Sequence, residues 1–265
     1  MTMQRRDFLL AAGAAAGAAV LPGCATVGGG SAGKVVVVGG GYAGATCAKY
    51  LRMWSNGAVE VTLIEPREAF VSCPISNLVI GGSKTIADVT VPYDNLSRRW
   101  GVNVVRDAAT GVDVDKRVVT TAGGRTFAYD RLVLAPGIEF MWDSIKSYAA
   151  NPERATEIAP HAWQAGPQTV LLRRQLESMP DGGVYAISIP VAPYRCPPGP
   201  YERACQVAWY FKRAKPKSKV LVLDGNPDVT SKAGLFKKAW NEEYKGLVEY
   251  RPNHVLTDVD LATKT

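Results

Sequence analysis

Three kinds of residue in this sequence could do chemistry: a run of glycines, an acidic residue and two cysteines. Gly39, Gly41 and Gly44 have the G-x-G-x-x-G spacing. At this spacing the first glycine can make a tight turn, the second lets backbone approach a pyrophosphate, and the third lets a helix pack closely on a strand. Glu65 follows roughly 20 residues later, where a carboxylate can accept hydrogen bonds from a ribose diol. Together these residues predict a dinucleotide-binding site.

Cys73 and Cys196 lie in loops, which is not typical of cysteines that pack in a core. Cys73 stands between a serine and a proline, and Cys196 stands in a proline-rich loop over residues 190–200. A thiolate is a nucleophile that can be alkylated or can exchange with a disulfide. The prolines of the second loop remove amide donors, so we expect no pyrophosphate cradle and no NAD site there.

The elements that would position the glycines alternate between strand and helix. Residues 35–38 are four valines, the pattern of a short strand buried on both faces of a parallel sheet. A helix is expected over 43–53 and a second strand over 59–64. The helix N-terminus would offer free N–H groups to phosphate, so Tyr42 and Ala43 join the candidate binding residues. This order predicts an α/β fold with a Rossmann-like domain.

A further apolar strand is expected in residues 129–137, YDRLVLAPG, which we predict to be buried and closed by a small-residue turn. Backbone in such a turn can lie against a cofactor. Arg67, just after Glu65, could reach the cofactor's phosphate or adenosine. The remaining candidate binding residues are therefore Pro66, Arg67, Ala135, Pro136 and Gly137.

The rest of the chain divides into a first domain over 34–145 and a second over 146–265. The second contains a strand over 184–189, a helix over 202–212 and a strand over 220–223, the order of a second nucleotide-binding unit. A helix and a strand are expected after residue 228. In the first domain we also expect strands at 89–93, 102–106, 112–114, 117–121 and 126–129, and helices at 78–80 and 95–100.

Composition excludes several classes of function. The chain has 265 residues, of which 47% are apolar and 21% charged, an ordinary globular composition. The net charge is +7, but no dense basic patch interleaved with aromatic residues appears, so we expect no nucleic-acid partner. With two histidines, His161 and His254, we expect no histidine-based metal site, and we interpret both as structural or surface residues.

Residues 1–33 are predicted to be a targeting segment with a flexible lead. Arg5 and Arg6 precede a short apolar run, an arrangement that resembles signals of the bacterial twin-arginine pathway. The protein is therefore expected in the periplasm. Lipid anchoring at Cys24 is a less favoured alternative.

These motifs resemble the FAD domain of two-dinucleotide-domain flavoprotein reductases. Two stretches, FVSCPISNLVIGG and VAPYRCPPGPYERACQVAWYFK, resemble the flavoprotein subunit of flavocytochrome c sulfide dehydrogenase, and the resemblance extends over about residues 34–228. It implies covalent attachment of FAD through Cys73 and a redox disulfide at Cys196 as the catalytic group. It also implies that sulfide is oxidised and that electrons leave to a c-type cytochrome subunit. This chain has no C-x-x-C-H run, so the haem is expected on that partner.

The chain departs from the family in length. The resemblance implies that both Rossmann-like domains are incomplete, because a third FAD motif and the disulfide partner of Cys196 are missing. Cys205 is the nearby substitute, although helix geometry could hold it too far away. We expect Cys47 to pack as a small apolar residue. Two alternatives stay open: a quinone-reducing sulfide oxidoreductase, and a truncated, non-catalytic FAD-binding remnant.

Overall fold

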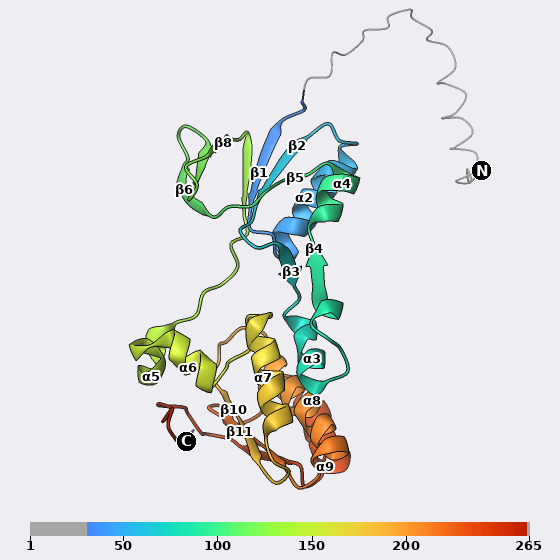
Figure 1. Ribbon diagram of the computed structural model, residues 1–265, viewed down its shortest axis with the longest axis vertical. Helices are drawn as coiled ribbons and strands as arrows, with labels where there is room; N and C mark the ends of the chain where they lie inside the picture. Colours follow the sequence, from blue (N-terminus) through green and yellow to red (C-terminus); the bar gives the residue numbers. More distant parts are fainter. Residues whose placement is uncertain (1–30, 264–265) are drawn as a thin grey trace, which may run out of the picture.

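A parallel sheet forms the centre of the upper lobe in this computed structural model, which describes residues 31–263 (Figure 1). β1 lies inside the sheet and pairs in parallel with β2 and β9. Val36 and Val37 of β1 are almost fully buried, as expected for a β-branched run between two covering layers. The strand order is β5-β2-β1-β9, with β1 (Lys34–Val38), β2 (Glu60–Ile64), β5 (Asn103–Val105) and β9 (Arg131–Leu134).

The two faces of this sheet are covered by different elements. Val35, Val37 and Leu63 pack on one face with Ala48 of α2 (Tyr42–Trp54) and Tyr93, just before α4 (Asp94–Trp100). On the other face, side chains of the sheet pack on an antiparallel three-stranded sheet. Its strands are β6 (Ala109–Asp113), β7 (Val118–Thr121) and β8 (Thr126–Ala128), in that order. Successive side chains of β1 thus serve two cores, as the two-residue period of a strand requires.

The prediction that the strand before Ala135 is buried is wrong. β9 pairs only with β1 and forms the edge of the sheet in the described part of the chain. Leu134 is 61% exposed, and Leu132 and Val133 are only partly buried. The apolar run does form a strand, as predicted. Its burial would require another element beside β9 at the edge of the sheet, and the residues of the strand do not specify such a neighbour.

The lower lobe contains a second parallel sheet, with strand order β10-β11-β12. The fully buried Tyr201, Val207 and Phe211 of the long helix α8 pack with Ile189 and Val222 from the strands. The predicted strand, helix and strand, and the helix and strand that follow, are all confirmed. The elements are α7 (Pro167–Ser178), β10 (Val184–Ile189), α8 (Gly199–Ala214), β11 (Lys219–Asp224), α9 (Ala233–Glu242) and β12 (Val248–Arg251).

Three helices that follow β9 in the chain were not predicted. They are α5 (Lys146–Ala150), α6 (Pro152–Ile158) and α7, preceded by the short 3-10 helix η4 (Trp142–Ser144). Two of them carry a usable signal, because Pro152 and Pro167 each occupy the first helical position. Leu172 and Leu176 of α7 are also buried four residues apart on one helix face.

Residues 72–89 cross from the upper lobe to the lower one and return. The antiparallel pair β3 (Ala69–Val71) and β4 (Thr90–Pro92) forms the crossing, and the teal helix α3 lies among the yellow and orange helices α7 and α8 (Figure 1). Ile80 is fully buried in the core of the lower lobe. The division of the chain at residue 145 is therefore incomplete. The segment contains η2 (Pro74–Ser76), α3 (Asn77–Gly81) and η3 (Ala87–Val89).

Close packing explains the glycines that end α3. A Cβ atom at Gly81 would lie 2.7 Å from Oε1 of Gln206 on α8, so the small residue lets the two helices approach. Gly82 ends the helix in the left-handed conformation that favours glycine.

The predicted twin-arginine segment and Cys24 lie outside the described residues. Within residues 31–263, no helix has both the length and the apolar character needed to cross a bilayer.

Candidate functional site

The glycine-rich turn between β1 and α2 lies at the carboxyl end of the parallel strands. Gly39 has φ +93°, and a Cβ there would overlap the carbonyl oxygen of Ala135 in the loop after β9. A Cβ at Gly44 would overlap the carbonyl oxygen of Gly39. The fold therefore brings this turn into contact with the Ala135–Pro136 loop, where small-molecule sites of open α/β sheets are found.

The N-terminus of α2 is open toward this edge of the sheet. Gly41 is the N-cap residue and gives the helix no side-chain cap, and a Cβ there would have no atom within 4 Å. The N–H groups of Tyr42, Ala43 and Gly44 have no hydrogen-bond acceptor among residues 31–263. Free N–H groups at a helix N-terminus, with space in front of them, suit the two phosphates of a dinucleotide.

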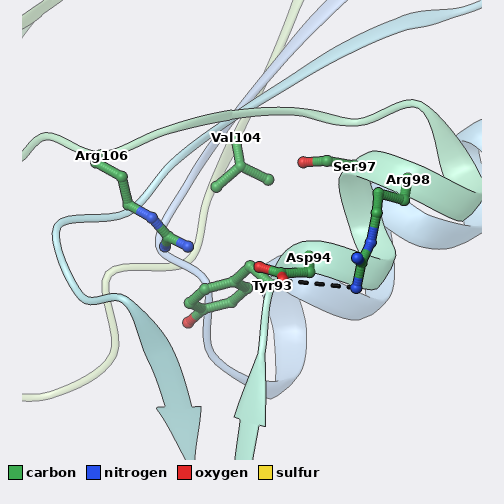
Figure 2. Close-up of a pocket in the computed structure, with 6 residues that line it drawn as sticks. All are labelled: Tyr93, Asp94, Ser97, Arg98, Val104 and Arg106. Carbon is green, nitrogen blue, oxygen red and sulfur yellow. Dashed lines mark ion pairs between the residues drawn. The ribbon is translucent and has the colours of Figure 1, made fainter.

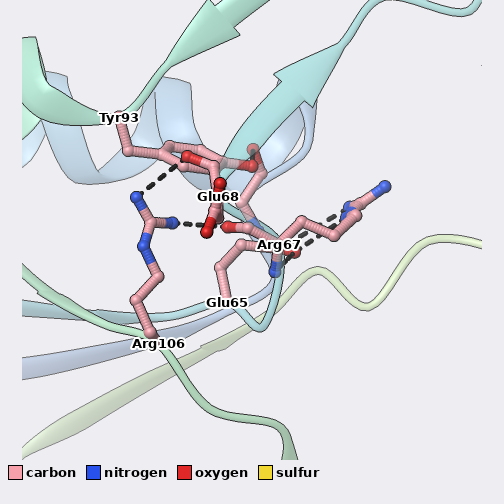
Figure 3. A network of polar contacts seen from close by, with 6 residues as sticks. Glu65, Arg67, Glu68, Tyr93 and Arg106 are labelled. Atoms are coloured by element: carbon pink, nitrogen blue, oxygen red, sulfur yellow. Dashed lines mark hydrogen bonds and ion pairs between the residues drawn. The ribbon is translucent and has the colours of Figure 1, made fainter. Parts of the chain in front are cut away.

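Glu65, at the end of β2, is 2% exposed and already bound by protein donors. Its carboxylate accepts from the N–H of Gly40 at 2.7 Å, from the N–H of Arg67 at 2.9 Å and from Nε of Arg67 at 2.8 Å (Figure 3). Burial alone would raise the pKa of Glu65, but the hydrogen bonds from Arg67 and Gly40 outweigh it and lower the pKa. Glu65 is thus an anion, and a ribose diol would share it with Arg67 or displace that half-exposed side chain.

Tyr93 contacts the glycine turn through its hydroxyl group, and the sequence did not identify it as a residue of this site. Its hydroxyl donates to the carbonyl oxygen of Gly40 at 2.8 Å, and a Cβ at Gly40 would lie 2.5 Å from that hydroxyl. Burial, and then the charge of Glu65, raise the pKa of Tyr93 to about 12. Gly40, the middle glycine of the Gly39–Gly41 run, was the available signal, since only the outer two belong to the motif.

Arg106, the residue that follows β5, joins this network. Its guanidinium lies 4.9 Å from the centre of the Tyr93 ring and donates to the carbonyl oxygens of Arg67 and Glu68 (Figure 3). Arg106 and Tyr93 also line a pocket of about 240 Å³, with Asp94, Ser97, Arg98 and Val104 (Figure 2). An ion pair between Asp94 and Arg98 at 3.5 Å lies along its rim. Arg106 thus fixes the loop after Glu65 to the sheet.

Cys73 and Cys196 approach the same tryptophan from different parts of the chain. The Sγ of Cys73 donates to the carbonyl oxygen of Trp163 at 2.9 Å. A Cβ built on Gly199 would lie 3.2 Å from the Sγ of Cys196 and 3.4 Å from the ring of Trp163. Burial raises the pKa of Cys73, the charge of Arg203 opposes this, and a thiolate at Cys196 adds to it. The structure therefore brings the two predicted cysteines to one site, carried by the lower lobe.

Cys196 has an unusual backbone conformation. Its φ is +57°, in the left-handed region that non-glycine residues rarely adopt, and its side chain is exposed and free. Cys205 has a different environment, because its Sγ accepts a hydrogen bond from Nε1 of Trp240 at 3.3 Å within the core of the lower lobe. Cys205 thus faces α9 in this structure, which does not favour it as the substitute partner of Cys196.

Sequence reasoning also missed the residues that surround the two cysteines. Arg203 is 2% exposed, and its guanidinium lies 3.5 Å from the centre of the Trp163 ring. Nδ1 of His161 accepts a hydrogen bond from the N–H of Trp163 at 3.0 Å. Burial, and then the charge of Arg203, lower the pKa of His161 to about 4, so the ring is neutral near pH 7. The cysteines provided a signal for this site, but no local pattern marks Trp163 or Arg203.

Two protein families match separate parts of this chain. Residues 33–148 match the family described as "Pyridine nucleotide-disulphide oxidoreductase". Residues 169–265 match the family described as "Sulfide dehydrogenase [flavocytochrome c] flavoprotein chain, central". The first match covers the glycine turn, Glu65 and Cys73, and the second covers Cys196 and Arg203.

Curated relatives agree with these matches. The sulfide dehydrogenase [flavocytochrome c] flavoprotein chain of Chlorobaculum thiosulfatiphilum is 59% identical over 39 residues, which are 15% of this chain and 79% of that one. The sulfide-quinone reductase of Aquifex aeolicus is 33% identical over 106 residues, 39% of this chain and 24% of the relative. The mitochondrial sulfide:quinone oxidoreductase of Dictyostelium discoideum is 25% identical over 156 residues, 59% of this chain and 34% of the relative. This chain thus spans a quarter to a third of these two longer relatives.

Solved structures confirm the predicted α/β fold. The sulfide:quinone oxidoreductase of Aquifex aeolicus superposes with a TM-score of 0.66 at 22% identity, over 86% of this chain and 52% of that one. The putidaredoxin reductase–putidaredoxin complex gives a TM-score of 0.65 at 18% identity, over 87% of this chain and 52% of the other. At these identities the likeness shows the fold alone.

Proposed function

Because this chain belongs to the family of flavocytochrome c sulfide dehydrogenase flavoprotein chains, we propose that it serves in the FAD-dependent oxidation of sulfide. The observation that carries the proposal is the placement of Cys73 and Cys196, distant in sequence, beside the same residue, Trp163. Two sulfur atoms at one site, in a chain with an open dinucleotide-binding turn, suit a reaction that transfers electrons from a sulfur compound to a flavin.

The residues of the upper lobe fit FAD. We propose that the N–H groups at the start of α2 hold its pyrophosphate, and that Glu65, Pro66 and Arg67 hold its adenosine side. The loop of Ala135, Pro136 and Gly137 would lie against it, since Gly137 has open space where a Cβ would stand. When bound, FAD supplies a two-electron acceptor that can release electrons one at a time.

We propose different roles for the two cysteines. Cys73 is half-buried at the start of η2 and would attach the flavin covalently through its sulfur. Cys196 is exposed, which lets a small sulfur nucleophile reach it, and would be the redox cysteine that contacts substrate as one half of a disulfide, which hydrosulfide opens with release of the other cysteine as a thiolate. The backbone strain of a left-handed cysteine is of a kind often found at functional sites.

The electron acceptor is a finer part of the proposal. We favour a c-type cytochrome subunit, because the matched family and the relative with 59% identity are flavocytochrome c flavoprotein chains. A quinone acceptor is the second candidate, supported by the two sulfide:quinone relatives. We also propose export to the periplasm through residues 1–33, on the basis of Arg5 and Arg6.

The test is reduction of the purified, flavin-loaded chain by sulfide, followed at the flavin absorbance band. Horse-heart cytochrome c and a short-chain ubiquinone are then offered separately as acceptors. We expect Cys196→Ser to abolish reduction, whereas the matched control Cys47→Ser, on α2 and away from Trp163, keeps it. A chain that binds FAD but is not reduced by sulfide would be the non-catalytic remnant and would refute the proposal.

A further inference from the structure

Arg203 of α8 is a buried cation at the centre of the sulfur site. Nε donates to Oδ1 of Asn77 at 2.9 Å, while the two terminal nitrogens donate to the carbonyl oxygens of His161 at 2.6 Å and Ala162 at 2.7 Å. The guanidinium also covers the face of Trp163. One side chain thus ties α3, the segment 161–163 and α8 together, and two of these segments adjoin the cysteine sulfurs.

The partners of Arg203 are neutral. Its hydrogen-bond acceptors are an amide and two backbone carbonyls, and no carboxylate among residues 31–263 forms an ion pair with it. Buried charges in proteins are usually paired, because removing an ion from water is costly. The hydrogen bonds offset part of that cost without cancelling the positive charge, which therefore acts on its surroundings through a medium of low polarity.

The groups that face this charge come from every element packed against it. Cys73 lies at the start of η2, Tyr185 lies on β10 and His161 precedes Trp163. Cys196, in the loop before α8, borders the same tryptophan, and Glu202 acts on Arg203 from the preceding position in the helix. His161 is neutral near pH 7 and Tyr185 is kept protonated by burial. Cys73 is thus the group whose ionisation an uncompensated cation would promote.

We propose that Arg203 is a positioning residue of the sulfur site, where its unpaired charge favours anionic sulfur at Cys73 while its hydrogen bonds hold that cysteine beside Cys196. For Cys73 itself, the inference depends only on the contacts given above. Its extension to the substrate rests on the proposed function: a hydrosulfide anion that enters between the cysteines would be favoured by the same charge.

The experiment compares Arg203→Lys, which keeps the charge but loses the planar fork, with Arg203→Gln, which loses both. The flavin-free fraction of the full chain is treated with iodoacetamide from pH 6 to 10, and the labelled peptides are quantified by mass spectrometry. Because a nearby opposite charge commonly lowers a pKa by about 1 to 3 units, the Gln variant should label Cys73 at least about tenfold more slowly near pH 7. The Lys variant should retain most of the wild-type rate, and Cys47 is the internal reference.

Equal losses in the Lys and Gln variants would mean that only the contacts of Arg203 matter and would overturn the proposal. If neither variant folds, Asn77→Asp replaces them, because it keeps the hydrogen bond to Nε and pairs the guanidinium with a carboxylate. Its expected result is slower labelling of Cys73, with Asn95→Asp on the exposed face of α4 as control. An unchanged pH profile in Asn77→Asp would equally refute the inference. The labelling needs neither sulfide nor flavin, so its outcome is independent of the test of the proposed function.

Discussion

Two glycines of the same motif should respond to alanine in opposite ways. Gly39→Ala places a side chain at φ +93° and against the carbonyl oxygen of Ala135, whereas Gly41→Ala has φ −70° and no atom within 4 Å of the new Cβ. The first substitution should therefore destabilise the fold, and the second should leave it intact while filling the space in front of the α2 N-terminus.

The magnitudes follow from these surroundings. A non-glycine residue in the left-handed region costs about 1–2 kcal/mol, and overpacking a close contact adds about 1–3 kcal/mol. Gly39→Ala should thus lose about 2–5 kcal/mol of unfolding free energy. For a protein of this size that loss corresponds to a fall of roughly 4–20 °C in Tm. Gly41→Ala should change the unfolding free energy by about 0.5 kcal/mol or less, as at an unstrained surface position.

Urea unfolding of the flavin-free chain measures the first effect, and quenching of FAD fluorescence on titration measures the second. We expect Gly41→Ala to bind FAD at least about tenfold more weakly, a cost of about 1.4 kcal/mol, because its methyl group occupies the approach to the free N–H groups. Wild-type affinity in Gly41→Ala would show that the dinucleotide does not use this turn. Wild-type stability in Gly39→Ala would show that the contact with Ala135 is not tight.

Three further predictions concern other parts of the chain. In the folded state the pKa of His161 is depressed to about 4, so its contribution to stability should be full above its ordinary pKa of 6.5 and fall as the pH drops from there toward 4. His161→Gln should flatten this dependence of the unfolding free energy on pH, measured by urea titration. An unchanged dependence in the variant would assign it to other groups. Cys73→Ser should release its flavin on acid denaturation while wild type retains it, as mass spectrometry of the denatured chain would show; flavin that stays attached to the variant would exclude this cysteine. Replacing Arg5 and Arg6 with lysine should leave the precursor in the cytoplasm, and periplasmic accumulation in fractionated cells would contradict the signal.

Local patterns were enough to predict most of the strands, though not the short β3, together with the helices next to the motifs and the glycine turn. The Val35–Val38 run and the glycines specify β1 and the start of α2 through steric preferences that act over a few residues. The same holds for α8 and α9, whose apolar faces repeat with the helical period.

What the sequence did not reveal depends on tertiary contacts. The exposure of Leu134 depends on which strand lies beside β9, and the burial of Ile80 depends on α3 packing into the lower lobe. The cysteine site has the same origin, because Trp163 and Arg203 become its walls only when α3 and α8 meet. The sequence around a charged helical residue such as Arg203 does not show whether its side chain is buried and bonded to several segments or exposed at the surface.

The excursion of residues 72–89 has a consequence for how tightly a dinucleotide could be held. The α2 N-terminus belongs to the upper lobe, whereas Cys73 is fixed to Trp163 on the lower one, and the short β3–β4 pair joins them. A ligand that engages both is bivalent, so once one end is seated the other meets its site at an effective concentration set by this short connection. Two weak attachments then act as one strong one, and separating the lobes would require both to be released.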